Sequence, residues 1–420
     1  MPTHLDTAAI WLIGITVIAL ILLRPRRIPE YVWATAGALL LVLTRLVPVP
    51  QALASVHEGS NVYMFLTGMM LLSEVARLHG VFDWLAALAM QHARGSRLRL
   101  FSLIYAVGIL VTALLSNDAT AVVLTPAVLA VVRRGRMSPL PYLFACAFVA
   151  NAASFVLPIS NPANLVLFDA RLPTLANWLH TFLLPAAVAI GLTFALLCWH
   201  SRKDLAGSID DGHVPAPLSA QGKRAALGIL LAAVLLLLTS AAGRPLGPPT
   251  CAAAILLLLV VSAPDFRGIH TAVRDISWGV LPLVAGLFVL VGALNHAGAL
   301  PLAVAALHRV AGWSPVAGAT ATAFGAGLAA NVLNNLPVGL IGSEAIRAGG
   351  ASPLLHAAAL LGIDLGPNLS VTGSLATILW LIALRREKID VSAGRFLRAG
   401  VLVMPPVLLL AALALALGTR

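Results

Sequence analysis

Long apolar runs, separated by short polar or basic stretches, follow one another along almost the whole chain. Most are close to the ~20 residues that an α-helix needs to cross a bilayer, whereas barrel strands would be ~10-residue segments of alternating polarity. The pattern therefore predicts an all-α membrane protein with many crossings. The apolar segments lie at residues 7–23, 31–48, 60–78, 100–132, 139–168, 174–199, 225–242, 247–263, 277–296, 313–346, 352–384 and 395–418, and shorter amphipathic stretches at 80–93 and 299–311 are predicted to lie at the membrane interface.

The apolar segment 100–132 is too long for a single crossing. Basic clusters flank both of its ends, and Arg and Lys collect in cytoplasmic loops, so both ends are expected on the cytoplasmic side. This predicts a re-entrant helical hairpin with its tip at Ser116, Asn117 and Asp118. Two short spans joined at the same turn are the alternative. The flanking residues are Arg94, Arg97, Arg99, Arg133, Arg134 and Arg136.

The chain divides into two halves of similar layout around a hydrophilic, cytoplasmic linker at residues 201–224. Five crossings are expected in each half, and an odd number inverts the second half relative to the first. All but six of the 27 Lys and Arg then fall at or near cytoplasmic ends, and both termini are expected outside. The predicted repeats are residues 1–200, with a hairpin at about 100–132 and a broken helix at about 139–168, and residues 225–420, with a hairpin at about 313–346 and a broken helix at about 352–384.

Composition agrees with a membrane protein, because 60% of the residues are hydrophobic and only 10% are charged, against about a quarter charged in soluble domains. The net charge of +11 does not indicate a nucleic-acid partner, since the basic residues sit at the ends of apolar segments. Cys146, Cys198 and Cys251 are scattered, so neither a disulfide framework nor a metal site is predicted, and no cofactor is expected. The first segment is not read as a signal peptide, because its basic cluster follows the apolar core.

Polar residues interrupt four apolar segments at corresponding places in the two halves. Such breaks leave free backbone N–H and C=O groups in the bilayer, which is tolerated only inside protein or along a polar cavity. Matched breaks in two repeats are the best pointer to a substrate site in a secondary transporter. A simpler interpretation is that these side chains only cap half-helices. The predicted substrate-binding residues are Ser116, Asn117, Ser160, Asn161, Asn164, Asn334, Asn335, Thr372, Gly373 and Ser374.

Two carboxylates, Asp118 and Asp364, lie in or beside these breaks without a basic residue nearby in the same segment. A charged group in mid-membrane costs a few kcal/mol and is usually functional. Because a partly desolvated carboxyl group can exchange a proton near neutral pH, both are predicted to couple transport to protons. Glu74 and Glu344 each precede an Arg by three residues and are expected to form ion pairs on helix surfaces.

Three motifs carry a family resemblance. Residues 116–126 read SNDATAVVLTP, residues 334–337 read NNLP, and residues 362–380 read GIDLGPNLSVTGSLATILW. Together they resemble the arsenical pump membrane protein (ArsB) family of the ion transporter superfamily, and the resemblance covers most of the chain. The third motif is the most specific of the three.

This resemblance implies a transporter that exports arsenite and antimonite from the bacterial cytoplasm across the inner membrane, driven by proton entry. In some members a soluble ATPase is a partner, and a homodimer is compatible with the family. The superfamily fold implies an elevator, in which a transport domain holding the hairpins and broken helices moves against a scaffold. Asn151 stands where an acid is expected and Asn368 where a Lys is expected, so one opposite-charge pair is missing.

The chemistry of the breaks fits this substrate. Arsenite at neutral pH is an uncharged trihydroxide, and Asn and Ser side chains match its oxygens better than a cationic pocket would. No basic residue lies in any break, which argues against uptake of dicarboxylates. A sodium/proton antiporter of the same superfamily and an exporter of another neutral hydroxide, such as silicic acid, stay open as alternatives. The chain has no HExxH or GxSxG motif, so a transporter is predicted rather than an enzyme.

Overall fold

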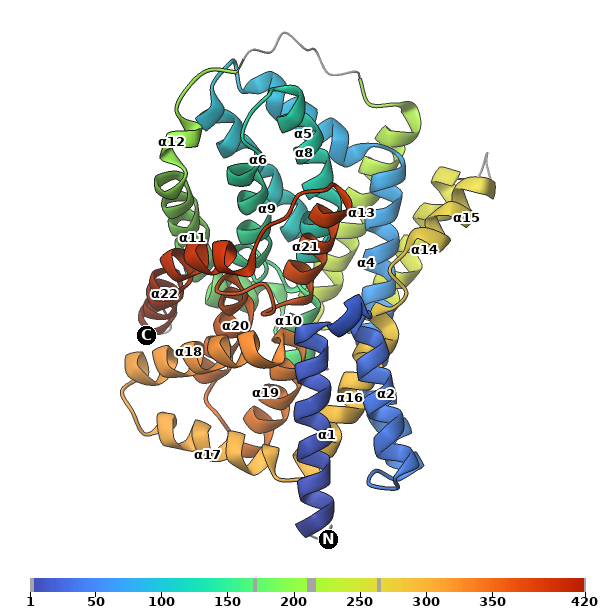
Figure 1. Ribbon diagram of the computed structural model, residues 1–420, viewed down its shortest axis with the longest axis vertical. Helices are drawn as coiled ribbons and strands as arrows, with labels where there is room; N and C mark the ends of the chain where they lie inside the picture. The colour runs from blue at the N-terminus through green and yellow to red at the C-terminus, as the bar shows by residue number, and fades with distance from the viewer. Residues whose placement is uncertain (1–3, 169–171, 210–216, 263–265, 419–420) are drawn as a thin grey trace.

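The computed structural model describes residues 4–168, 172–209, 217–262 and 266–418 (Figure 1). Helices dominate these residues, and their only β pairing is an isolated bridge between Ser96 and Ser208. Seven stretches of the described chain are long and apolar enough to cross a membrane. The predicted all-α, multi-pass membrane fold is confirmed.

In the first half the helices follow the predicted apolar segments, with additions that the hydrophobic pattern did not reveal. A short helix, α3, fills the space between the second and third apolar segments, and a single turn, α12, follows the last one. The helices are α1 His4–Leu23, α2 Glu30–Leu43, α3 Val49–Glu58, α4 Ser60–Leu78, α5 Val81–His92, α6 Arg97–Leu114, α7 Asn117–Ala119, α8 Thr125–Arg134, α9 Leu140–Ala152, α10 Pro162–Phe168, α11 Leu175–His200 and α12 Arg202–Leu205.

The second half contains one helix, α15, that was not predicted. Helices α5 and α17 occupy the two amphipathic stretches expected at the interface. The helices of this half are α13 Ala220–Ala241, α14 Gly247–Ser262, α15 Phe266–Asp275, α16 Val280–His296, α17 Ala299–Ala311, α18 Pro315–Leu333, α19 Asn335–Gly349, α20 Pro353–Leu365, α21 Leu375–Arg386 and α22 Ala393–Gly418.

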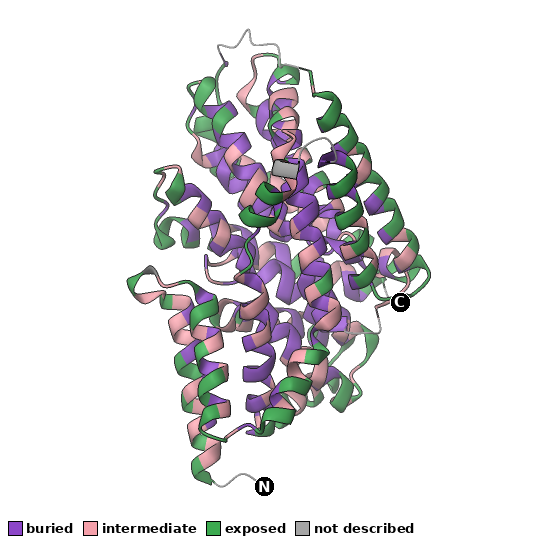
Figure 2. Ribbon diagram, turned by 90° about the vertical axis from the view of Figure 1, so that its right-hand side faces the viewer, coloured by how far each residue is buried: buried purple, intermediate pink, exposed green. Residues whose placement is uncertain are grey.

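The interrupted helices lie in the middle of the molecule. In Figure 1, α9, α10, α20 and α21 occupy the centre, with α5, α6 and α12 above them and α17, α18 and the N-terminal end of α1 below. Helix α4 packs along α14, α11 along α22, and α18 along α20. Buried residues concentrate at this centre, whereas the outer helices carry the exposed side chains (Figure 2). The polar breaks are therefore enclosed by protein, as irregular backbone in a membrane requires.

Both segments in which a hairpin was expected contain a helix interruption. The first lies at Leu115 and Ser116, where Ser116 is extended (φ −171°) and its Oγ accepts a hydrogen bond from Ala119 N at 3.1 Å. The second is a single residue, Asn334, with φ 73° and ψ 154°. That conformation is sterically unfavourable for a residue with a Cβ, and strain of this kind clusters at functional sites. The broken helices are interrupted at residues 153–161 and 366–374.

Close packing of α18 against α20 fixes the position of the second broken helix. A Cβ at Gly362 would overlap the carbonyl oxygen of Ala323, and one at Gly366 would lie 2.5 Å from Gly327 Cα. Small residues allow helix backbones to approach in membranes, where packing replaces the hydrophobic driving force between helices. Asp364 lies between these two glycines in sequence, so their close packing against α18 fixes the position of its backbone.

The two expected surface ion pairs differ from the prediction. Glu74 does pair with Arg77, but its carboxylate is buried and not on a helix surface. Glu344 accepts a hydrogen bond from Asn295 Nδ2 at 2.5 Å, and none of the salt bridges between described residues joins it to Arg347. Tertiary packing is the reason, because α16 lies beside α19 and offers the Asn295 amide.

Helix ends in this chain place basic residues in the left-handed region that usually favours glycine. Of the described non-glycine residues with positive φ, all but Asn334 are basic: Arg24, Arg26, Arg45, Arg94, Arg136 and Lys388. A residue with a Cβ loses about 1–2 kcal/mol in this conformation, whereas glycine adopts it freely.

We predict that Arg136→Gly is more stable than Arg136→Ala by about 1 kcal/mol, because Arg136 has φ 49° and follows the end of α8. Thermal unfolding in detergent measures the difference. At Arg134, the last residue of α8, the order should reverse, since glycine in right-handed helix is up to about 1 kcal/mol worse than alanine. Equal stability of the two Arg136 variants would contradict the role assigned to backbone strain.

Candidate functional site

The first hairpin tip is held by its own side chains and by the first broken helix. Asn117 Oδ1 accepts a hydrogen bond from Asp118 N at 2.9 Å, and Thr112 bonds Thr120 across the hairpin at 2.8 Å. Ser160 Oγ donates to Ala113 O at 3.2 Å, satisfying a carbonyl that the end of α6 leaves free. The two breaks of the first half are therefore joined directly.

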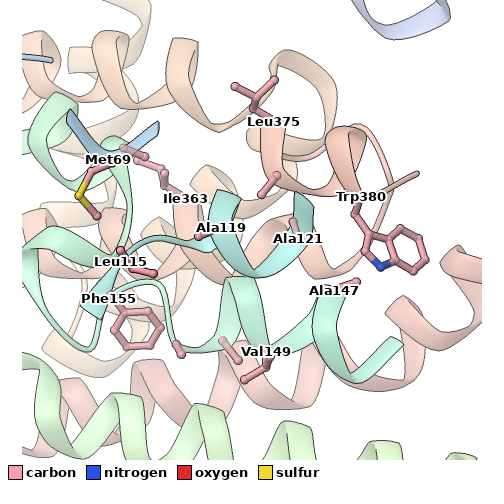
Figure 3. Close-up of a cluster of buried hydrophobic side chains, with 14 of the residues drawn as sticks. Met69, Leu115, Ala119, Ala121, Ala147, Val149, Phe155, Ile363, Leu375 and Trp380 are labelled. Atoms are coloured by element: carbon pink, nitrogen blue, oxygen red, sulfur yellow. The ribbon is translucent and has the colours of Figure 1, made fainter. Parts of the chain in front are cut away.

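Apolar side chains from both halves pack around this tip. Figure 3 shows Ala119 of the hairpin near Leu115 and Ile363, with Phe155 from the first broken helix and Leu375 from α21 in the same cluster. All five are buried. These apolar side chains surround the hairpin tip and offer its polar atoms no hydrogen-bond partners.

In the first broken helix the amides reach the surrounding backbone. Asn164 Nδ2 donates to Ser154 O at 2.9 Å, and Asn161 Oδ1 caps α10 by accepting from Ala163 N at 3.0 Å. The other end of the Asn161 side chain is turned elsewhere, because its Nδ2 donates to Asp364 Oδ1 at 2.7 Å. Asn161 therefore caps a helix and also joins the two halves of the chain.

The second hairpin tip rests on the loop between α20 and α21. Asn335 N donates to Gly373 O at 3.0 Å, and Thr372 Oγ1 donates to Asn331 O at 3.1 Å. Asn331 was not predicted, although an amide one turn before a break is a visible signal. Its Nδ2 donates to Gly366 O at 2.8 Å, and its Oδ1 accepts from Ser370 Oγ at 2.5 Å.

The capping interpretation is correct for part of the predicted set. Ser116, Asn334 and Ser374 each accept a hydrogen bond from a backbone N–H of the half-helix that follows. Capping is only part of the role of Asn161, which also binds Asp364, and it does not describe Asn164, whose amide donates backwards into the loop. Polar side chains at the breaks therefore do more than end helices.

Three buried oxygens at the breaks have no hydrogen-bond partner among the described residues. They belong to Asn164 (Oδ1), Asn335 (Oδ1) and Asp364 (Oδ2), whose side chains are at most 3% exposed. A buried acceptor without a partner costs about 1–3 kcal/mol, and more if it is charged. Such atoms are where a proton, a cation or a hydroxyl group of a substrate would be stabilising.

A cavity of about 740 Å³ lies beside the first hairpin tip, between α4, α5, α8, α21 and the end of α15. Ser116, Asp118 and Pro162 line it, so the first hairpin and the start of α10 both reach it. The remaining predicted residues do not line the cavity. Asp118 is half-buried, whereas Asp364 is almost fully buried.

Charged side chains at the cavity are mostly acidic. The lining carboxylates are Glu74, Asp83, Asp118, Asp275 and Glu387, and the lining guanidinium groups are Arg77 and Arg386. A cavity with more carboxylates than cations attracts cations, accepts neutral molecules and repels multivalent anions.

Ion pairs at the mouth of the cavity tie helices together. Arg77 donates from Nε to Glu74 at 2.9 Å and from Nη2 to Asp275 at 2.9 Å, which joins α4 to α15. Arg133 pairs with Glu387 at 2.7 Å, which joins α8 to the end of α21. Asp275 lies 198 residues from Arg77, so no local pattern in the sequence could reveal this contact.

The site can hold small polar molecules and ions but offers no preformed metal cage. Among the described residues, no group of three or more His, Cys, Asp or Glu side chains is arranged to bind a metal. Cys146, Cys198 and Cys251 lie in three different helices, α9, α11 and α14.

Residues 17–362 match the protein family described as citrate transporter. This match covers more than half of the chain.

Individual relatives carry a more specific name. The Arsenical pump membrane protein of Escherichia coli K12 is 29% identical over 96% of this chain and 97% of that protein. The protein of the same name in Yersinia enterocolitica is 28% identical over 80% of this chain and 82% of its own. The resemblance predicted from the three motifs is confirmed by these relatives.

Among solved structures, the YdaH transporter of Alcanivorax borkumensis is similar in fold. It aligns with a TM-score of 0.57 over 87% of this chain and 86% of its own, at 16% sequence identity. At that identity the likeness concerns the fold alone.

We predict that Arg77→Met lowers the free energy of unfolding by about 1–2 kcal/mol, because it leaves the buried Glu74 carboxylate without its cation. The half-exposed position of Arg77 keeps the loss below that of a fully buried pair. Thermal unfolding in detergent measures it. The double variant Glu74→Gln with Arg77→Met should recover most of the loss, and equal losses in the single and double variants would show that the charge is not the cause.

Proposed function

The chain belongs to the citrate transporter family of membrane transporters, and we propose that within it the protein exports arsenite and antimonite as neutral trihydroxides in exchange for protons. The names of its relatives in Escherichia coli and Yersinia enterocolitica support this substrate. So does the predicted resemblance of the hairpin and broken-helix motifs to the ArsB family.

The acidic lining of the cavity is the observation that separates this proposal from citrate transport. Five carboxylates and two guanidinium groups line it, and a third guanidinium, that of Arg133, pairs with the lining Glu387. The carboxylates still outnumber the cations, and this excess of negative charge would repel an entering citrate trianion. An uncharged trihydroxide meets no such barrier. Recognition would rest on Ser116 at the cavity and on Asn117, Ser160, Asn161, Asn164, Asn334, Asn335, Thr372, Gly373 and Ser374 as helices rearrange around the breaks.

The direction of transport follows from the predicted topology. Arg77, Arg133 and Arg386 are at the mouth of the cavity, and the charge bias assigns these helix ends to the cytoplasm. A cavity open to the cytoplasm is where an exporter takes up its substrate. The inverted repeats, the elevator motion, the bacterial inner membrane, a homodimer and a soluble ATPase partner belong to the same proposal.

Proton coupling is assigned to Asp118 and Asp364. Asp118 lines the cavity and can exchange a proton with water there, whereas Asp364 is buried with one oxygen unpartnered. An ionised carboxylate is unfavourable in that setting, so binding of a proton to Asp364 is stabilising. Substrate release outside and proton loading outside then occur in the same conformation.

A sodium/proton antiporter is the second candidate, because the acidic cavity and the unpartnered oxygens also suit a monovalent cation. Radioactive sodium flux in everted vesicles discriminates between the two. The arsenite proposal expects export to proceed at full rate without sodium, whereas the alternative requires sodium movement coupled to protons in the absence of metalloid.

We predict that Asp118→Asn weakens the pH dependence of arsenite export, leaving only the contribution of Asp364, while keeping the shape of the hairpin tip. In the wild type, export should fall as external pH rises, because fewer coupling carboxyl groups load a proton from outside. Export is measured as arsenite uptake into everted vesicles over a range of lumenal pH, since the vesicle lumen corresponds to the outside of the cell. Asp83→Asn, a carboxylate in the same cavity but away from the breaks, is the matched control. An unchanged pH profile in Asp118→Asn would show that Asp118 does not carry a coupling proton.

Thiols should not be needed for transport, although trivalent arsenic binds thiolates strongly. The three cysteines lie in different helices, and only Cys146 is in a helix that leads to a break. A carrier must also release its cargo, which tight soft-metal coordination opposes. We predict that a variant with all three replaced by Ser or Ala confers arsenite resistance on a pump-deficient bacterium within about twofold of the wild type. Loss of resistance at normal membrane levels would instead identify Cys146 as a ligand.

A further inference from the structure

Two helices of the chain end in the same way, and each reaches into the break that belongs to the other half. Helix α9 and helix α20 both have 13 residues, both have a Pro in the first two positions, and both are followed by a break. The residue before the last is Asn151 in α9 and Asp364 in α20. These two positions are therefore equivalent in the two helices, but only one of them is an acid.

Asn151 contacts the second break through both ends of its amide. Its Nδ2 donates to Asn368 Oδ1 at 3.0 Å and lies 3.5 Å from Thr377 Oγ1, and its Oδ1 accepts from Ser374 Oγ at 3.4 Å. Asn151 and Asn368 are both at most 2% exposed. The Asn151 side chain is therefore uncharged, and both ends of its amide have hydrogen-bond partners.

Asp364 makes the reciprocal contact, into the first break, but it is not satisfied. Asn161 Nδ2 donates to its Oδ1 at 2.7 Å, while its Oδ2 is buried without a geometric hydrogen bond among the described residues. The Ser154 hydroxyl is also near the Asp364 carboxyl group, but it donates to Asn151 O at 2.8 Å. An ionised carboxylate in this position is unfavourable until a proton or another cation arrives. The same position in the two helices is therefore an ion site in one and a neutral hydrogen-bonded pair in the other.

Resting on the proposed function, we propose that Asn151 sets the number of protons exchanged per substrate, by keeping the second of two equivalent sites free of a proton. Only the site at Asp364 then loads a proton at the level of the broken helices. Asn151 is a positioning residue in this proposal and touches no substrate.

The chemistry of Asn151→Asp follows from the atoms that it would face. The Asn151 atom nearest Asn368 is a donor, and it meets an acceptor, Asn368 Oδ1. A carboxylate oxygen there would face that acceptor, whereas a protonated carboxyl group would donate to it. The variant therefore gains a proton site. Adding Asn368→Lys supplies a cation in place of the acceptor, so that the carboxylate stays ionised and the extra proton site disappears.

The test measures arsenite accumulation at steady state in everted vesicles, with the membrane potential clamped at zero and the pH gradient varied. Each proton exchanged adds a factor of ten in accumulation per pH unit. Asn151→Asp should steepen the dependence by one further factor of ten per pH unit relative to wild type. Asn151→Asp with Asn368→Lys should return it to the wild-type value. An unchanged dependence in Asn151→Asp that still transports arsenite would overturn the proposal.

A swap variant guards against poor folding of the single change. Asp364→Asn alone should lower the dependence by a factor of ten per pH unit, and adding Asn151→Asp, which supplies a carboxyl group at the equivalent position, should restore it. A weaker dependence in the swap would also overturn the proposal. Failure of the proposed function is distinguishable, because the wild type would then show no accumulation of arsenite driven by a pH gradient.

Discussion

Backbone polar groups inside a bilayer need partners, and this constraint governs the centre of the molecule. Four helix interruptions leave N–H and C=O groups without intrahelical bonds, and lipid offers none. The structure meets the need with side-chain and backbone groups that reach from one break to the helix or loop of another. Ser160 binds the carbonyl that α6 leaves free, Asn331 binds Gly366 O, and Asn335 N donates to Gly373 O. Polar residues at the breaks are held by another break, by the cap that they form or, as for Asn164, by carbonyl groups of their own loop.

The same constraint leaves a buried carboxyl oxygen at the breaks that an ion would stabilise. Where partners run out, as at Asp364 Oδ2, a buried oxygen is left that a proton or cation would stabilise. Crossed contacts such as Asn161 with Asp364 join the two halves, so a change of charge at one break is felt in the helix of the other. Coupling between ion and substrate needs this kind of link, because it allows the two binding events to favour the same rearrangement.

Family membership and site chemistry bear on function at different levels. The family is described as citrate transporter, and its match concerns most of the chain. The side chains that line the cavity include more carboxylates than cations, and this excess of negative charge opposes entry of a multivalent anion. The proposed neutral substrate is compatible with both observations, since the family consists of membrane transporters and an acidic lining does not repel an uncharged molecule.

Much of this could be predicted from the sequence, because helices in a membrane are dictated by local hydrophobicity and breaks by local polarity. The positions of the interruptions at Ser116 and Asn334 follow from that. What the sequence did not reveal depends on tertiary packing. Helix α15 is too polar for a hydrophobicity scan, and the contact of Arg77 with Asp275 joins residues far apart. Glu344 binds Asn295 and not its neighbour Arg347, because α16 packs against α19.

In the proposed function, the cavity admits a neutral metalloid hydroxide and excludes a multivalent anion. Uptake into vesicles containing the purified protein distinguishes these cargoes when a pH gradient is imposed and arsenite, citrate and sodium are measured side by side. The predicted result is accumulation of arsenite driven by the pH gradient, with no uptake of citrate and no requirement for sodium. Accumulation of citrate without movement of arsenite would contradict it.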